Sequence, residues 1–75
     1  MPDDQLIDQL VEAAKRLIAE NDRGIVDGDD VARAIGRDPE ADGLYDAFCV
    51  IEQRGVLKLD AWGGGMGLPH GVQLP

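Results

Sequence analysis

The sequence contains neither serine nor threonine, and it has one cysteine and one histidine, Cys49 and His70. Without hydroxyl side chains there is no serine or threonine nucleophile and no hydroxyl for a Walker-type phosphate loop. A lone cysteine forms no internal disulfide, and a zinc site would need help from another chain. We therefore predict that the protein is not an enzyme and has no cofactor, no metal ligands and no small-molecule substrate.

Basic residues are also scarce, because 7 Lys and Arg stand against 15 Asp and Glu, for a net charge of -8. DNA affinity comes largely from Lys and Arg replacing phosphate counterions, so this balance disfavours DNA as a partner. No apolar run approaches the roughly 18 residues of a membrane span. The start "MPDDQLIDQL" lacks the basic and apolar segments of a signal peptide. We expect a cytoplasmic protein that contacts no membrane.

What the sequence does contain fits one small folded domain over residues 1–75, with 44% hydrophobic and 29% charged residues. A chain this short builds a marginal core, so a dimer or a partner surface would help to stabilise it. Apolar residues recur at three- and four-residue steps between residues 6 and 18, which predicts an amphipathic helix. Asp3 and Asp4 favour its start, and "ENDRG" ends it.

The segment "GIVDGDD" predicts a short strand at Ile25 and Val26, followed by a brief helix that Asp27 or Asp29 caps and Gly36 ends. A third helix is predicted over residues 38–54, with Asp38 as its cap and Pro39 in its first turn. Its buried face comprises Leu44, Ala47, Phe48 and Ile51, and Gly55 is its left-handed stop.

A hairpin is predicted after the third helix. Residues 56–62, "VLKLDAW", alternate like a strand, the glycine-rich residues 63–71 form the tip, and "VQL" at 72–74 returns. Asp60 and His70 face each other only in some hairpin registers, which the sequence leaves open. His70 is otherwise interpreted as a solvated loop side chain.

Residues 37–48, "RDPEADGLYDAF", also begin like a calcium-binding EF-hand loop. Counted from Asp38, acids fall at positions 1, 3, 5 and 9 and Gly43 at position 6. Position 12, however, is Cys49, so the carboxylate that supplies two ligand oxygens is missing. These acids are therefore interpreted as helix caps and solvated groups.

The stretch "DGDDVARAIGRDPEADGLYDAFCVIEQRGVLKL" resembles a winged helix-turn-helix domain. The similar features are the short helix "DDVARAIG", a turn, a helix with Leu44, Phe48 and Ile51, and then "QRGVLKL". The resemblance implies an α+β fold in the order helix, short strand, helix, helix, strand, wing, strand. In DNA-binding members it implies that the helix at 38–54 enters the major groove and that residues 63–71 form the wing.

The charges depart from that DNA-binding pattern, because residues 38–54 carry five acids against Arg54 alone. The remaining candidates for phosphate contacts are Arg33, Arg37, Arg54 and Lys58. These four side chains can equally balance neighbouring acids at a solvated surface.

Apolar side chains in the wing favour a protein partner instead. The glycine-rich hairpin contains Trp62, Met66 and Leu68, residue types suited to interfaces, and Tyr45 extends this set from the third helix. Alternatively, the Trp62 side chain packs against the core of its own chain. Our first hypothesis is a small acidic winged-helix module that acts through protein contacts, by self-association or by docking on a larger, possibly regulatory complex. The alternative is a DNA-binding transcriptional regulator.

Overall fold

The chain begins with a long amphipathic helix, α1, over Asp4–Glu20. The computed structural model describes residues 3–64 and 67–75. Asp3 caps α1, since its carboxylate accepts a hydrogen bond of 2.9 Å from the backbone N–H of Gln5. One face of α1 is buried, as the spacing of its apolar residues predicts, and comprises Leu6, Ile7, Leu10, Val11, Ala13, Ala14 and Ile18. The prediction of this helix and of its acidic start is confirmed.

The next two elements are short and adjoin at Asp27. Strand β1 spans Ile25–Val26, and helix α2 spans Gly28–Ala34. Of the two caps that the sequence allowed, Asp27 is the one used, because its Oδ1 accepts from the backbone N–H of Asp29 at 2.9 Å. Both predicted elements are therefore confirmed.

Helix α3 spans Leu44–Arg54, so the predicted start at Asp38 is wrong. The Asp38 carboxylate does accept from a free amide, that of Glu40 at 2.9 Å, but this bond closes a turn. Gly43 has a φ of 89°, in the left-handed region, and a residue in that conformation interrupts a right-handed helix. Residues 38–43 are consequently a loop that leads into α3. The predicted buried face of α3 and its stop at Gly55 are confirmed.

The hairpin consists of β2, Lys58–Trp62, and β3, Pro69–Gln73. The sheet order is β1-β3-β2, and both pairings are antiparallel, so Val72 lies beside both Val26 and Leu59. Strand β3 starts earlier than predicted, because Pro69 pairs with Trp62 and Gly71 with Asp60. Proline is tolerated there since the first residue of a strand need not donate to the ladder.

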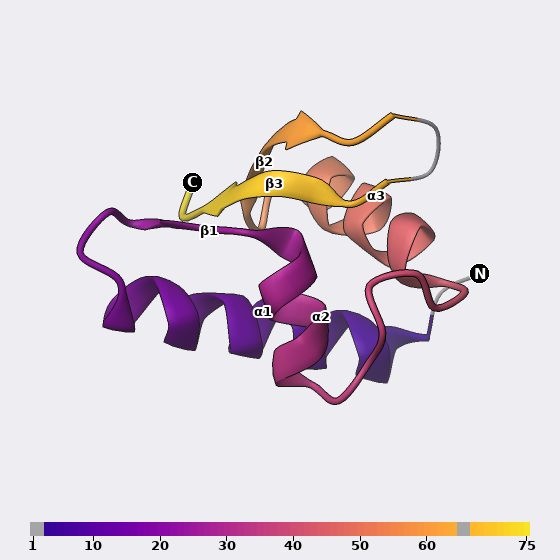
Figure 1. The fold of residues 1–75 in the computed structure, drawn as a ribbon. Helices are drawn as coiled ribbons and strands as arrows, with labels where there is room; N and C mark the ends of the chain where they lie inside the picture. Colours follow the sequence, from indigo (N-terminus) through magenta and orange to yellow (C-terminus); the bar gives the residue numbers. More distant parts are fainter. Residues whose placement is uncertain (1–2, 65–66) are drawn as a thin grey trace.

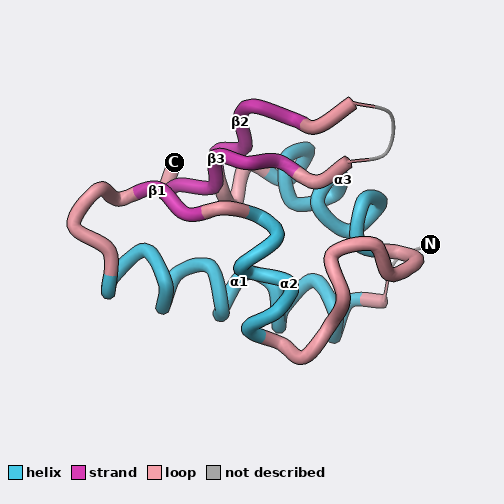
Figure 2. Tube along the Cα trace, in the orientation of Figure 1, coloured by secondary structure: helices cyan, strands magenta, loops and turns pink. Residues whose placement is uncertain are grey.

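Helices α1 and α2 pack against the sheet and α3 packs against α1, with α1 running along the base of the molecule in the view of Figure 1. Figure 2 shows the three strands together above α1. Each helix and the central strand contribute a fully buried side chain to the core: Leu10 from α1, Val31 from α2, Phe48 from α3 and Val72 from β3. Among the residues that the structure describes, no charged or polar side chain is buried in this core.

The chain is thus a small α+β domain of three helices and a three-stranded antiparallel sheet, in the element order predicted from the sequence. Its topology is consistent with that of a winged helix, in which the β2–β3 hairpin is the wing. Across residues 3–64 and 67–75, no helix combines the length and the apolar character that crossing a membrane requires.

Candidate functional site

Two aromatic rings meet where α3 adjoins the hairpin. Tyr45 lies in the first turn of α3 and Trp62 at the end of β2, and their ring centroids are 5.7 Å apart with 69° between the planes. This edge-to-face arrangement is one that aromatic rings favour. The indole Nε1 of Trp62 also donates to Oε2 of Glu52, seven residues after Tyr45 on α3, at 3.3 Å. We call Tyr45, Cys49, Glu52 and Trp62 the α3–β2 surface.

The side chain of Trp62 is partly buried, at the border of the hydrophobic core. It packs against the hydrophobic core, yet it is only half-buried, as Tyr45 and Cys49 are. Glu52 beside it is exposed. The α3–β2 surface therefore presents partly accessible aromatic rings with an acidic border.

The phenol of Tyr45 has an altered environment. Hydrogen bonding to the Cys49 side chain, followed by the charge of Cys49, raises the pKa of Tyr45 above its ordinary value of 10.0. The nearby carboxylates of Asp46 and Glu52 raise this pKa further, because a second negative charge is unfavourable beside them. The phenol is consequently held in its neutral, hydrogen-bonding form.

Leu68, another predicted contact residue, does not join this surface. Leu68 is only 3% exposed and belongs to the hydrophobic core, so its side chain is not available to a partner in this conformation. Next to the end of β2, the N–H of Gly63 donates to the carbonyl of Leu68 at 3.2 Å. Met66 lies outside the described residues.

The four candidate phosphate-binding residues are spread over separate segments. Arg33, on α2, pairs with Asp30 at 3.3 Å, and Arg54, at the end of α3, pairs with Asp4 at 3.5 Å. Exposed pairs of this kind contribute little stability, but they place each guanidinium beside a carboxylate of its own chain.

Arg37 and Lys58 line two different hollows. Arg37 lies with Asp3 and Gln9 near the start of α1, and Lys58 lies with Glu52 beside the start of β2. The charge of the helix that would enter DNA is also less negative than the sequence indicated. Three of its five predicted acids, Asp38, Glu40 and Asp42, lie in the preceding loop, which leaves Asp46 and Glu52 on α3.

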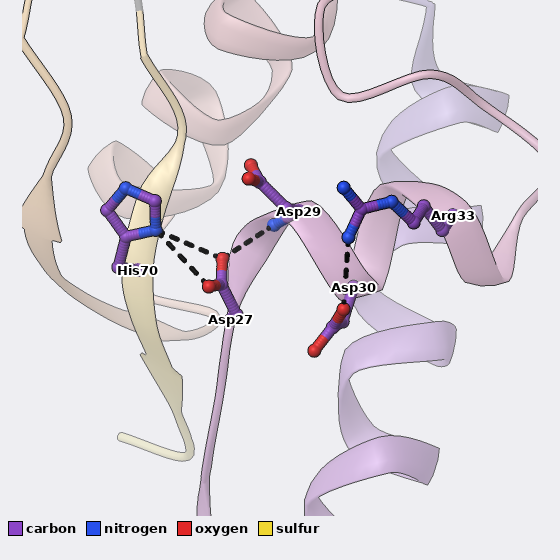
Figure 3. Close-up of polar contacts among 5 residues, drawn as sticks. All are labelled: Asp27, Asp29, Asp30, Arg33 and His70. Atoms are coloured by element: carbon purple, nitrogen blue, oxygen red, sulfur yellow. Dashed lines mark hydrogen bonds and ion pairs between the residues drawn. The ribbon is translucent and has the colours of Figure 1, made fainter.

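A second group of side chains, which the sequence analysis did not bring together, lies where α2 begins beside β3 (Figure 3). His70 Nδ1 is 3.2 Å from Oδ1 and 3.3 Å from Oδ2 of Asp27. One ligand-capable atom from each of Asp27, Asp29 and His70 lies within 4.8 Å of the others. Asp60, the other acid considered for His70, pairs with Gly71 across the hairpin and its carboxylate bonds to the N–H of Ala61.

A close backbone approach explains why this second group forms. A Cβ at Gly28 would overlap the carbonyl oxygen of Pro69, so only glycine lets the start of α2 lie this near to β3. Asp27 precedes Gly28 and His70 follows Pro69, and the approach therefore brings their side chains face to face. The adjacent glycine and acids in "DGDD" were the available signal, but the partner strand depends on the tertiary fold.

The chain gives no match to any protein-family model, curated protein or solved structure with which it was compared. Its function has to be argued from the residues on its surface, because a fold of this kind supports many activities.

Proposed function

We propose that this chain is a small acidic winged-helix-like module that binds a positively charged partner protein through the α3–β2 surface. The observation that carries the proposal is the half-buried ring pair of Tyr45 and Trp62, bordered by Glu52 on a chain of net charge -8. The proposal concerns a binding module and includes no catalytic role.

The aromatic pair favours a protein as the partner. Tyrosine and tryptophan are enriched at protein interfaces, where a rigid ring supplies contact area at a small entropic cost. Here the Glu52 carboxylate and the ring contact with Tyr45 hold Trp62 in place before any partner arrives. Such preorganisation lowers the entropy lost on binding.

The charge favours a basic partner over a second copy of this chain. Two copies would each bring a charge of -8, and repulsion between like charges opposes their association. The acids Asp46 and Glu52 flank Tyr45 and Trp62 and are exposed. A segment that carries both Lys or Arg and an apolar side chain complements this surface.

The alternative, DNA binding through Arg33, Arg37, Arg54 and Lys58, gains no specific support. Two of these cations pair with acids of this chain, and α3 exposes Asp46 and Glu52 on its own surface.

An amide NMR titration tests the proposal with three probes: a short peptide of alternating Lys and Leu, a duplex DNA of random sequence, and a dilution series of the protein alone. We expect the peptide to shift the resonances of Tyr45, Glu52 and Trp62. A peptide of alternating Lys and Gly is the control for charge alone. We expect Tyr45→Ala to weaken Lys–Leu peptide binding about tenfold, as loss of an interface hot spot does, and to leave binding of the Lys–Gly peptide nearly unchanged.

Ile25→Ala is the matched variant, because Ile25 is 43% exposed on β1, at the opposite edge of the sheet from β2. It should bind the Lys–Leu peptide like the parent protein. Salt-sensitive shifts at Arg33 and Arg37 on adding DNA would instead establish the alternative. Shifts at Tyr45 and Trp62 that depend on protein concentration would replace the basic partner with a second copy.

A further inference from the structure

Three polar side chains from two segments converge at the junction of α2 and β3 (Figure 3). We propose that Asp27, Asp29 and His70 bind a divalent transition-metal ion of the Zn²⁺ type. The site goes beyond the proposed protein contact and does not depend on it. It also revises the expectation, drawn from the sequence, that the chain offers no metal ligands.

The spacing of Asp27 and His70 suits a shared ion. Bonds of about 2.0–2.1 Å from Zn²⁺ to nitrogen and oxygen place two ligand atoms of a tetrahedral site about 3.3 Å apart. The Nδ1 atom of His70 is 3.3 Å from Oδ2 of Asp27. An ion between these atoms would replace the direct contact, with Nδ1 deprotonated and the ring proton on Nε2.

The cap of α2 survives this use of Asp27. The N–H of Asp29 bonds to Oδ1 of Asp27, which leaves Oδ2 to face His70. Asp29 is the third ligand, because the three ligand atoms lie within 4.8 Å of one another. The ion would therefore join the start of α2 to the wing strand without unfolding either.

The residues around the proposed metal site are acidic and leave it open to solvent. Asp29, Glu40 and His70 line one surface hollow, which leaves room for water as the fourth ligand. The ion pairs recorded for residues 3–64 and 67–75 leave both Asp29 and Glu40 without a cationic partner. The side chains of His70 and Asp27 are 51% and 40% exposed, which lets an ion enter from solvent.

The ligand types select the kind of ion. Ca²⁺ and Mg²⁺ take oxygen ligands, whereas imidazole nitrogen suits Zn²⁺, Cu²⁺ and Ni²⁺. One nitrogen with two carboxylates and an open position is therefore a better match to Zn²⁺ than to either alkaline-earth ion.

The test is a Zn²⁺ titration of the chain, prepared without a histidine tag and followed by proton NMR of the imidazole. His70 is the only histidine, so its ring signals report the site directly. We expect saturation at one Zn²⁺ per chain, with amide shifts at Asp27 and Asp29, and little response to Mg²⁺. Asp29→Asn preserves the contact between Asp27 and His70 and should weaken Zn²⁺ binding about tenfold or more.

Asp8→Asn removes an exposed carboxylate from α1 and is the matched control, which should bind Zn²⁺ like the parent. The titration is repeated in a Cys49→Ala background, because Cys49 is the other side chain that Zn²⁺ favours. Equal affinity in Asp29→Asn and the parent would reduce the site to a single surface histidine and overturn the proposal. Loss of binding in Cys49→Ala, or no saturable shift at millimolar Zn²⁺, would overturn it as well.

Discussion

The ring of Trp62 meets the ring of Tyr45 edge to face, at 5.7 Å between centroids, and thereby joins the end of β2 to the first turn of α3. The two elements are linked through the intervening turn at Gly55 and also through these side chains. Stability measurements can therefore detect the contact independently of any partner.

A double-mutant cycle should reveal this contact. We expect Tyr45→Ala and Trp62→Ala to be coupled by about 0.5–1.5 kcal/mol, the usual worth of an aromatic pair beyond its burial. Urea unfolding followed by far-ultraviolet circular dichroism measures it without relying on the fluorescence of Trp62. The control cycle pairs Tyr45→Ala with Ile25→Ala, which should be additive within about 0.5 kcal/mol. Additivity in both cycles would mean that the ring contact contributes nothing.

The phenol of Tyr45 should titrate above its ordinary range. Because Cys49 and then the nearby acids raise its pKa above 10.0, the absorbance of its phenolate should appear at a higher pH in the folded than in the urea-unfolded chain. The folded state holds this proton more tightly, so the contribution to stability is complete below pH 10 and declines as the pH rises through the folded pKa.

Tyr45 is the only tyrosine, so the absorbance change near 295 nm belongs to one group. Cys49→Ala should move the folded midpoint back toward 10.0, since it removes the largest cause of the shift. An unchanged midpoint in Cys49→Ala would assign the shift to the acidic neighbours instead.

Gly28 is expected to be intolerant of any side chain. In Gly28→Ala the new Cβ would overlap the carbonyl oxygen of Pro69, so β3 has to move, at a cost of about 1–3 kcal/mol typical of overpacking. Gly64→Ala is the control, because a Cβ there meets nothing within 4 Å. Thermal unfolding compares the two variants. Equal stability would show that β3 adjusts freely and that the close approach is not a constraint.

Replacing Ala61 with glycine should stabilise the folded domain. The φ of 55° at Ala61 lies in the left-handed region, the one such value of a non-glycine residue in the described part of the chain. That conformation costs an L-residue about 1–2 kcal/mol, and the greater freedom of glycine in the unfolded chain returns about 0.5–1 kcal/mol of this. We expect Ala61→Gly to stabilise the domain by about 0.5–1 kcal/mol in urea unfolding.

Ala19→Gly provides the opposite case, because Ala19 has ordinary helical geometry in α1. The same chemical change should destabilise the domain there by up to about 1 kcal/mol. Loss of stability in both variants would indicate that the backbone at Ala61 is not strained.

Local patterns in the sequence were enough to predict most of the fold. The spacing of apolar residues located α1 and the buried face of α3, the acids located the start of α1, and Gly55 located the end of α3. The error at residues 38–43 arose because an Asp-Pro pair begins turns as well as helices. Gly43, which adopts a left-handed conformation, was the local signal for a later start.

The candidate sites were less predictable, because they depend on which segments meet. The position of Leu68 in the core and of Trp62 beside Glu52 follows from the hairpin register, which side-chain alternation near glycines does not specify. The approach of His70 to Asp27 requires β3 to lie against the start of α2, a contact between residues far apart in the chain. Local sequence patterns do not predict this contact between distant residues.

The position of β3 between β1 and β2 also bears on how the domain folds. The hairpin of β2 and β3 can close early, since its loop is short, whereas β1 must wait for Val72 to arrive from the distant end of the described chain. We expect the helices and the hairpin to be structured in the transition state and β1 to join after it. Substitutions at Val26 should then accelerate unfolding and leave the rate of folding almost unchanged.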